Sequence, residues 1–382
     1  MSDTAPPQTL AVDVAVVGGG MVGASLAAGL IGTGVRLLLI EAVPFGASAQ
    51  PSFDERTTAL GNASRRIFEG LGVWDAIAPE AAPIRAIHVS DAGRFGSARL
   101  SAAEQGVEAL GYVVPNRRIG AALWGLLRGA AGPALRVPAS VEDVAIETSG
   151  VRFTLASGER REAVTARLVV AADGAHSQIR SAAGIEAAVE DYAQVAVVAN
   201  VASDTPHGGI AYERFTPAGP LAVLPLADGT LSCIWAIRRE DAPRVLALED
   251  GAWLAELQSR FGWRAGRFVR SGRRASYPLK LTRAASPVAA RTVLIGNAAQ
   301  ALHPVAGQGF NLGLRDAAML AEVIAGSSGD VGAPALLERF AAWRAADRGG
   351  VTRFTDGLVR LFGDERFGVG LLRNLGLLLF DL

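Results

Sequence analysis

The amino-acid sequence predicts an α/β protein in which a Rossmann-like body with a parallel sheet is interrupted by an inserted, mostly antiparallel β-sheet domain. Three observations support this fold class. An apolar strand, a glycine-rich turn and an Ala-rich helix open the chain, as in a βαβ unit. The later segments "ARLVVAADG" and "RTVLIG" are typical of further buried strands. Between residues 186 and 280, short alternating segments are separated by turn dipeptides such as Asp228-Gly229, which indicates an antiparallel sheet.

Composition limits the classes of function before any motif is considered. Of the 382 residues, 50% are hydrophobic and 19% are charged, so the chain can bury a large core in two domains or in one body with an insertion. Lys plus Arg and Asp plus Glu number 37 each, and this balance excludes a protein built to bind nucleic acid. Cys233 is the single cysteine and there are four histidines, so we expect no disulfide, no metal centre and a reducing compartment.

The first 41 residues are expected to form a βαβ unit. "LAVDVAVV" is a short apolar strand, the helix after it is expected to end near Gly32 and Gly34, and "VRLLLIE" is a second buried strand. The apolar run 10–31 resembles a signal segment in hydropathy, but it contains Asp13 and follows the polar leader "MSDTAPPQT" without a basic region. We therefore expect no export signal and a cytoplasmic location.

A phosphate-binding turn is predicted where the first strand meets the first helix. Residues 18–23, "GGGMVG", satisfy G-x-G-x-x-G in that context. Gly18 would allow the tight turn, Gly20 would let the backbone approach a pyrophosphate, and Gly23 would let helix and strand pack closely. The helix N-terminus would offer N–H groups to the phosphates. Glu41, at the tip of the next strand, would bind a ribose diol and repel a 2′-phosphate, so the turn predicts FAD or NAD.

Two later segments carry a resemblance to a known family. Asp173 to Arg180 contains D-G-x-x-S-x-x-R, and Gly296 to Asn311 contains G-[DN]-A-A-x-x-x-x-P-x-x-G-x-G-x-N, each after a strand. With the glycine turn, and in this order and spacing, they resemble the single-component FAD-dependent aromatic hydroxylases of the para-hydroxybenzoate hydroxylase type. The resemblance covers almost the whole chain. "FDERTTAL" and "YERFTPAGPLAVLPL" are similar to the ubiquinone-biosynthesis hydroxylases of that group, and most similar to the 2-polyprenyl-6-methoxyphenol hydroxylases.

The resemblance implies that the last segment lies along the ribityl chain and isoalloxazine ring of FAD. It places Gly296 and Asn297 near the ribityl chain and Pro304 against the ring. Independently of the family, a helix N-terminus at Gly309 to Asn311 would stabilise the negative charge of reduced flavin. The expected cofactor-binding residues are Gly18, Gly20, Gly23, Glu41, Arg56, Asn116, Arg117, Asp173, Gly174, Gly296, Asn297, Pro304, Gly307, Gln308, Gly309 and Asn311.

Some of these residues have a structural alternative. Arg56 would otherwise make a surface salt bridge, and Asn116 would otherwise cap a helix. His303 is expected beside the reactive edge of the flavin, with a structural histidine as the alternative to a catalytic role. The residues expected at the reaction site are His303, Pro304, Gly307 and Gln308.

The chemistry is expected to come from the cofactor, because the sequence contains no H-E-x-x-H motif and no Ser-His-Asp order that would indicate a hydrolase. Reduced flavin forms a C4a-hydroperoxide with O₂, from which an electron-rich phenol takes up oxygen. The sequence therefore predicts an FAD-dependent monooxygenase that hydroxylates a polyprenylated phenol in ubiquinone biosynthesis, with NAD(P)H as a transiently bound reductant. The alternatives are a reductase, dehydrogenase or halogenase of the same fold and a non-enzymatic prenyl-lipid carrier.

The expected domains follow from the strand patterns. Residues 1–75, 104–185 and 281–350 would form the FAD-binding domain, and residues 76–103 and 186–280 the substrate domain. Residues 351–382 would form a C-terminal helical segment. Its apolar part, Phe367 to Phe380, is shorter than the ~20 residues that span a bilayer. We expect a buried helix there, or alternatively a segment that docks on a membrane surface or on a ubiquinone-biosynthesis assembly, with peripheral membrane attachment.

Overall fold

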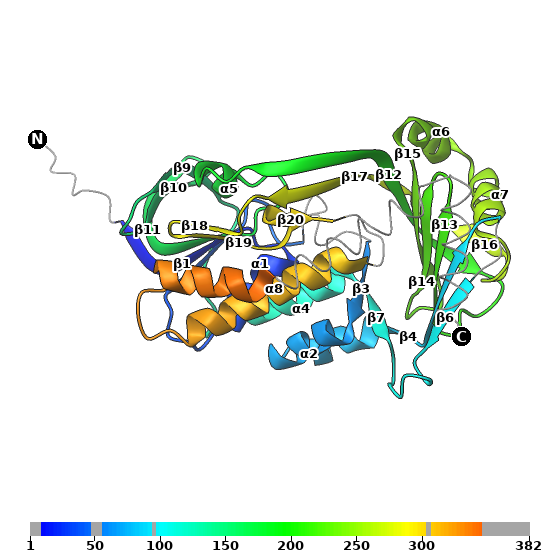
Figure 1. Ribbon diagram of the computed structural model, residues 1–382, viewed down its shortest axis with the longest axis horizontal. Coiled ribbons are helices and arrows are strands. Elements are labelled where there is room, and N and C mark those ends of the chain that lie inside the picture. The colour runs from blue at the N-terminus through cyan, green and yellow to red at the C-terminus, as the bar shows by residue number, and fades with distance from the viewer. Residues whose placement is uncertain (1–8, 47–55, 94–96, 303–306, 346–382) are drawn as a thin grey trace, which may run out of the picture.

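A computed structural model of the chain describes residues 9–46, 56–93, 97–302 and 307–345. These residues form three β-sheets with helices around them (Figure 1). An eight-stranded sheet with helices packed on it makes one body, and a nine-stranded sheet stands at the other end of the molecule. This arrangement agrees with the predicted fold class.

The eight-stranded sheet has a parallel centre. β1 pairs in parallel with β2 on one side and with β11 on the other, and β8 and β19 extend the parallel part. β11 is long because its first part pairs antiparallel with β10 and its last part pairs in parallel with β1. The strands are β1 (Leu10–Val17), β2 (Leu37–Ile40), β8 (Ala134–Arg136), β9 (Ser140–Ile146), β10 (Val151–Ser157), β11 (Arg160–Ala171), β18 (Val288–Ala289) and β19 (Thr292–Leu294).

Helices cover one face of this sheet. α1 lies between α4 and α8, and the three share one apolar core with the sheet (Figure 1). α1 ends at Gly29, a few residues before the predicted stop at Gly32 and Gly34. The helices of this body include α1 (Met21–Gly29), α2 (Asn62–Gly70), α3 (Trp74–Ile77), η2 (Ala78–Glu80), α4 (Asn116–Leu127), α5 (Gln178–Ala182), η4 (Gly296–Ala298) and α8 (Gln308–Ala325), and residues 334–345 are helical as well.

The nine-stranded sheet is antiparallel except where β5 pairs in parallel with β13. The predicted turn at Asp228-Gly229 joins β14 to β15, which confirms that part of the strand pattern. One face packs on α6 and α7 in a separate core. The elements are β5 (Ala86–Asp91), β6 (Ser97–Ser101), β12 (Ala187–Ser203), β13 (Ile210–Thr216), β14 (Gly219–Pro225), β15 (Leu231–Arg238), η3 (Arg239–Asp241), α6 (Ala242–Ala247), α7 (Asp250–Phe261), β16 (Phe268–Ser271), β17 (Ala275–Ala284) and β20 (Gln300–Ala301).

A small third sheet lies between these two bodies. It is antiparallel, with β7 (Gly111–Pro115) between β3 (Thr57–Gly61) and β4 (Ala82–Ile84). The long paired strands β12 and β17 run from one body to the other (Figure 1). The chain therefore crosses between the bodies on several strands, and both bodies border the space between them.

The predicted domain limits remain a prediction, although two strands lie across them. β20 pairs with β17, so a segment assigned to the FAD-binding domain adds a strand to the nine-stranded sheet. β4 lies in the predicted substrate domain but pairs with β7 in the third sheet. The predicted C-terminal helical segment, 351–382, lies outside the described residues. Among the residues that the structure describes, no helix is both long enough and apolar enough to cross a membrane.

Candidate active site

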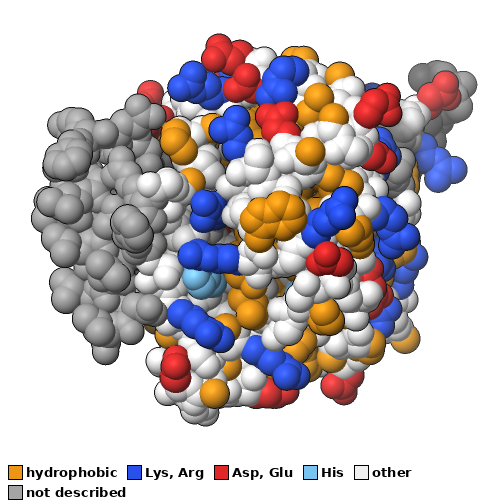
Figure 2. Space-filling view, turned by 90° about the vertical axis from the view of Figure 1, so that its right-hand side faces the viewer, with side chains coloured by type: hydrophobic (Ala, Val, Ile, Leu, Met, Phe, Trp, Pro, Cys, Tyr) orange, Lys and Arg blue, Asp and Glu red, His pale blue; other side chains and the backbone are white. Residues whose placement is uncertain are grey.

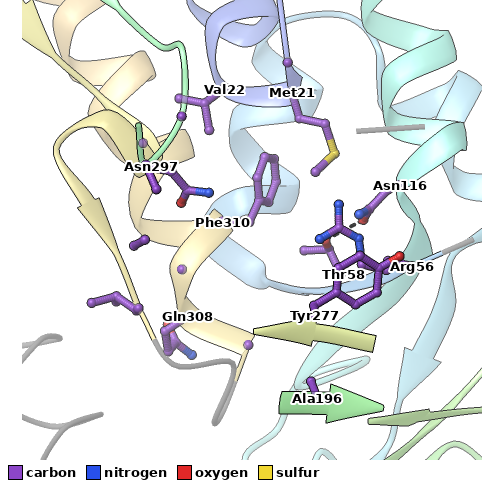
Figure 3. Close-up of a pocket in the computed structure, with 18 of the residues that line it drawn as sticks. Met21, Val22, Arg56, Thr58, Asn116, Ala196, Tyr277, Asn297, Gln308 and Phe310 are labelled. Atoms are coloured by element: carbon purple, nitrogen blue, oxygen red, sulfur yellow. Dashed lines mark hydrogen bonds between the residues drawn. The ribbon is translucent and has the colours of Figure 1, made fainter. Parts of the chain in front are cut away.

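One large cavity lies between the parallel-sheet body and the nine-stranded sheet. Its volume is about 1620 Å³, which exceeds the ~300–1000 Å³ of most small-molecule sites and leaves room for two ligands. Loops at the carboxyl ends of the parallel strands line one side, where ligands bind in open α/β sheets. Apolar side chains of the nine-stranded sheet line the other side. Figure 3 shows residues of both sides around the cavity.

The turn between β1 and α1 needs glycine at two positions for packing. Gly18 has a φ of +105°, and a Cβ there would lie 2.4 Å from the carbonyl oxygen of Ala172. A Cβ on Gly23 would lie 1.9 Å from the Gly18 carbonyl oxygen, so only glycine lets α1 approach the turn this closely. Gly20 has a φ of −61° and a ψ of 174°, which any residue can adopt. Gly18 and Gly20 line the cavity, and the role that the structure shows for Gly23 is packing.

Glu41 follows β2 and holds the glycine turn through its carboxylate. Its Oε2 accepts a hydrogen bond from the Gly19 N–H at 2.6 Å, and its Oε1 accepts one from the Val43 N–H at 2.9 Å. Trp124 of α4 supports the same turn, because its indole N–H donates to the Gly19 carbonyl at 3.1 Å. Glu41 lines the cavity, and each carboxylate oxygen can accept a second hydrogen bond. Its contact with a ribose stays a prediction.

The D-G-x-x-S-x-x-R segment forms the loop between β11 and α5. Asp173 Oδ2 accepts a hydrogen bond from the Gln178 N–H at 2.9 Å. Asp173 Oδ1 is buried and has no hydrogen-bond partner among the described residues, and burial raises the pKa of this carboxyl group. Asp173 and Gly174 both line the cavity. An unpaired buried oxygen at the wall fits a ligand that brings hydroxyl donors, as the ribose and ribityl groups of FAD would.

The Ser and Arg of the same motif have structural roles. Ser177 caps α5, since its hydroxyl accepts a hydrogen bond from the Arg180 N–H at 3.0 Å. The buried Arg180 guanidinium donates to the carbonyls of Ala298 and Ala175 at 3.0 and 2.9 Å. These bonds fasten the Asp173 loop to η4, which carries Asn297.

The segment predicted to lie along the flavin ring forms η4, β20 and the start of α8. Gly296, Asn297 and residues 307–309 all line the cavity. Gly307 precedes α8 with a φ of +60°, which favours glycine, and a Cβ there would lie 3.3 Å from Ala59 Cβ. Because α8 begins at Gln308, the N–H groups of its first turn and its positive dipole end lie at the cavity wall. His303 and Pro304 lie outside the described residues.

The side chain of Asn311 does not line the cavity, and contact of this residue with the cofactor stays a prediction. Its Oδ1 accepts hydrogen bonds from the Gly61 N–H at 3.0 Å and the Ser64 hydroxyl at 2.6 Å. Its Nδ2 donates to the carbonyls of Ala59 and Gly307 at 2.8 and 2.9 Å. All four hydrogen-bonding positions of the amide are therefore used to attach the start of α8 to β3 and α2.

Two predicted residues near the third sheet, Arg56 and Asn116, line the cavity. The Arg56 guanidinium lines the cavity and lies 4.4 Å from the ring centroid of Tyr277 (Figure 3). Asn116 also lines the cavity, where its Oδ1 accepts a hydrogen bond from the Thr58 hydroxyl at 2.7 Å. The N-cap residue of α4 is Pro115 and not Asn116, so the structure does not support the helix-cap alternative.

Arg117 points away from the cavity, so its predicted contact with the cofactor has no support in the structure. It is outside the cavity lining and donates to Glu80 Oε2 at 2.6 Å on a half-exposed surface. Successive residues of a helix point about 100° apart, so α4 can present Asn116 to the cavity only by turning Arg117 away from it.

Sequence reasoning missed the side chains of the nine-stranded sheet that line the cavity. Among them is a carboxyl group, Glu213 of β13, whose pKa burial raises from its ordinary 4.5 to about 7. The signal in the sequence is the alternation of "IAYERFT", which puts positions 211, 213 and 215 on one face. The apolar side chains of the sheet around it in the lining are Ile87, Val89, Ala98, Ala196, Val198, Ala211, Phe215, Pro220, Ala222, Leu224, Ile234, Ala236 and Leu279.

Comparison with known proteins shows a family and four similar proteins. The family model described as "FAD binding domain" matches residues 11–355. The chain is 40% identical over 369 residues to ubiquinone hydroxylase UbiL of Rhodospirillum rubrum, with 96% of this chain and 85% of the relative covered. It is 35% identical over 371 residues to the 3-demethoxyubiquinol 3-hydroxylase of Escherichia coli, with 95% and 90% covered.

Solved structures show the fold alone at lower identity. PqsL of Pseudomonas aeruginosa is similar with a TM-score of 0.80 and 20% identity, over 95% of this chain and 100% of that one. The p-nitrophenol 4-monooxygenase PnpA of Pseudomonas putida is similar with a TM-score of 0.78 and 21% identity, over 98% and 94%.

Proposed function

This chain belongs to the FAD binding domain family and, within it, to the ubiquinone-biosynthesis flavin hydroxylases, and from this premise we propose that its substrate is a phenol carrying a polyprenyl chain. The chain is an FAD-dependent aromatic-ring monooxygenase that uses O₂ and NAD(P)H, as this family does. The substrate proposed in particular is a 2-polyprenyl-6-methoxyphenol. The names of the relatives support a ubiquinone precursor, because both are hydroxylases of ubiquinone or of a demethoxyubiquinol.

The observation that supports this proposal most is the two-sided character of the cavity. One side carries Asp173 with an unpaired buried oxygen and the N-terminus of α8, which suit a polar, anionic cofactor. The other side is a wall of aliphatic and aromatic side chains from the nine-stranded sheet, which suits a hydrophobic substrate. One continuous cavity therefore lets a phenol ring reach the cofactor while its polyprenyl chain contacts the apolar wall.

The residues of this chain have distinct parts in the proposed reaction. FAD, when bound, would supply the activation of O₂, and the oxygen atom that the ring receives would come from O₂. The glycine turn, Glu41 and Asp173 would hold its polar groups, and the first turn of α8 would stabilise negative charge on its ring. The apolar wall would orient the phenol and exclude water. Excluding water favours transfer of oxygen to the ring over release of hydrogen peroxide.

The proposal is tested by turnover with labelled oxygen. The FAD-loaded protein is reduced with NADH or NADPH and mixed with ¹⁸O₂ and a 2-prenyl-6-methoxyphenol of short chain length. We expect one labelled oxygen in the ring product, and a higher ratio of product to hydrogen peroxide when the phenol is present than when its methyl ether replaces it. If the flavin is reoxidised normally and no oxygenated product forms, hydroxylation of this phenol is wrong and a reductase of the same fold becomes the better explanation.

A further inference from the structure

Glu213 is a carboxyl group placed in the middle of an apolar wall. It belongs to β13, where its register partners on the neighbouring strands are Val89 of β5 and Ala222 of β14. Ala211 and Phe215 share its face of the strand, and all of these residues line the cavity. A strand can place an apolar residue at this position without cost, whereas a carboxyl group is expensive to bury.

The Glu213 carboxyl group has no hydrogen bond or ion pair to any described residue. On β5, the ring of His88 contacts that of Tyr212 and Asp91 lies opposite Phe215, two positions along. Arg214 of β13 donates instead to the Arg260 carbonyl. β14 has no charged residue.

Charged groups elsewhere in the cavity do not contribute to the raised pKa of Glu213. Arg56 and Lys280 also line it, but burial is the only cause that raises the pKa of Glu213. The carboxyl group is therefore available to a ligand that enters the cavity, and it can ionise near neutral pH.

We propose that the Glu213 carboxylate accepts a hydrogen bond from the phenolic hydroxyl of the substrate and takes up its proton. The proton moves from the phenol oxygen to a carboxylate oxygen, which leaves a phenolate and a neutral Glu213, and no bond to carbon changes in this step. A phenolate ring is more electron-rich than a phenol and takes up oxygen more readily. This inference rests on the proposed function for the reaction, but its binding step requires only a phenol.

The binding step is tested without turnover, on oxidised FAD-loaded protein. The probe is 2-prenylphenol, its control is the methyl ether of the same compound, and binding is followed by the change in flavin absorbance between pH 5.5 and 8.5. The wild-type protein should bind the phenol about 10-fold more tightly above pH 7 than below pH 6, because the ionised carboxylate is the stronger acceptor. The methyl ether should show no such rise.

Two variants separate the role of Glu213 from a structural one. Glu213→Gln should bind the phenol with the weak, pH-independent affinity of the wild type at low pH, and its hydroxylation rate should fall by ~10²–10⁴-fold. Glu190→Gln, on an exposed site of β12, should behave as the wild type. A phenol affinity in Glu213→Gln that still rises with pH would overturn the proposal. Failure of hydroxylation alone, with the binding pattern intact, would overturn the proposed function instead.

A second inference rests on a different observation, the distribution of charge. Residues 257–315 contain ten Lys and Arg and no Asp or Glu, although the whole chain is balanced at 37 of each sign. Within this stretch two apolar side chains are exposed, Trp263 at 70% in the loop after α7 and Val269 at 52% in β16. Arg264, Arg267, Arg270 and Arg273 are exposed beside them. We call these six residues the basic edge.

The basic edge has cations without matching anions. None of its four arginines forms an ion pair with a described residue. Arg264 also repels the guanidinium of Arg214, whose pKa is lowered by burial first and by this neighbour second. Figure 2 faces this end of the molecule and shows Lys and Arg side chains gathered around exposed hydrophobic ones.

The geometry points to a membrane surface with anionic lipids as the partner of the basic edge. Unpaired arginines are attracted to anionic head groups, and an exposed tryptophan is the side chain best suited to the boundary between head groups and acyl chains. Nucleic acid would match the charge but not the exposed Trp263 and Val269. Docking there would place the cavity-lining sheet beside the bilayer in which a polyprenylated molecule dissolves.

This docking is tested by co-sedimentation of the full FAD-loaded chain with vesicles of phosphatidylcholine alone or mixed with phosphatidylglycerol. We expect binding to the anionic vesicles only. Arg264→Glu with Arg267→Glu should reduce the bound fraction at least 10-fold, and Trp263→Ser severalfold. The matched reversal, Arg66→Glu with Arg160→Glu at exposed sites outside the basic edge, should leave it unchanged. Equal loss in both double variants, or equal binding to duplex DNA, would overturn the assignment.

Discussion

The two sides of the cavity are built in different ways. On the parallel-sheet side the path of the backbone determines which residues fit, because a Cβ on Gly18 or Gly23 would lie 2.4 or 1.9 Å from a carbonyl oxygen. On the nine-stranded side the strands pair regularly, and the side chains that face the cavity determine which ligand it can bind. At these two positions the first side leaves no room for a larger side chain. The second can change its ligand by exchanging single residues, since a strand position facing a cavity imposes few packing constraints.

Gly23→Ala should show the largest effect of this difference. The added Cβ would collide with the Gly18 carbonyl, which is backbone and cannot rotate away, so we expect a loss of ~4 kcal/mol or more in the free energy of unfolding. Urea unfolding and soluble yield measure it. Gly20→Ala is the matched control, because the φ of Gly20 suits any residue. It should fold and lose flavin instead. A wild-type unfolding midpoint for Gly23→Ala would show that the backbone side is not so constrained.

Asn311→Ala tests whether a residue close to the cavity is structural. The change leaves the Gly61 N–H and the Ala59 carbonyl without their partner, and we expect the free energy of unfolding to fall by ~2–4 kcal/mol. Denaturant unfolding and flavin retention are measured together. Asn297→Ala, which removes a cavity-lining side chain, should give the reverse result of weaker FAD binding with little loss of stability. If Asn311→Ala loses FAD but keeps its stability, the interpretation that Asn311 attaches α8 to β3 and α2 is wrong.

Glu213→Gln should stabilise the protein at alkaline pH. The folded pKa of Glu213 is about 7, raised from 4.5, so the folded state binds more protons than the unfolded state between these values. Wild-type stability should therefore fall as pH rises from 4.5 to 7. The variant has no carboxyl group to ionise at this position. It should be ~1–3 kcal/mol more stable than the wild type at pH 8, with no difference near pH 4. Parallel stability curves for the two proteins would contradict a raised pKa for this half-buried, unpaired carboxyl group.

Ala222→Leu should change the substrate side alone. Ala222 lines the cavity beside Glu213, and the larger side chain would occupy space that the phenol needs. We expect binding of 2-prenylphenol to weaken ~10-fold, which corresponds to ~1.4 kcal/mol, while flavin retention and unfolding stay as in the wild type. Ala222→Ser, a change of similar size to the original residue, is the control. Loss of flavin in the leucine variant would mean that the two sides are not independent.

Arg117→Ala should show the smallest effect. Its ion pair with Glu80 lies on the surface, and such pairs contribute at most ~0.5–1 kcal/mol. Flavin retention should not change. Arg56→Ala, which removes a guanidinium from the cavity wall and from the Tyr277 ring, should weaken ligand binding measurably. Equal flavin loss in the two variants would restore Arg117 to the site.

The glycine turn, the strands around it and the family could be predicted from the sequence because their causes are local. A strand, a G-x-G-x-x-G turn and a helix lie next to one another in the chain, and the close approach between Gly23 and Gly18 is set within six residues. Glu41 and Asp173 could be found for the same reason, since each lies within two residues of the end of a buried strand, at the carboxyl edge of the sheet.

What the sequence could not predict is the directions of side chains, because these depend on distant contacts. The sequence placed Asn311 and Arg117 at helix starts correctly, but the rotation of α8 and α4 about their axes is set by packing against α1 and the sheet, and this rotation turns both side chains away from the cavity. The alternation in β13 puts Glu213 on one face of its strand. Only the packing of α6 and α7 on the opposite face leaves the face with Glu213 toward the cavity. The sequence by itself therefore determined the elements and the cofactor turn, because their constraints are short in range. Only the tertiary structure decided which faces meet in the cavity, because that choice depends on segments far apart in the chain.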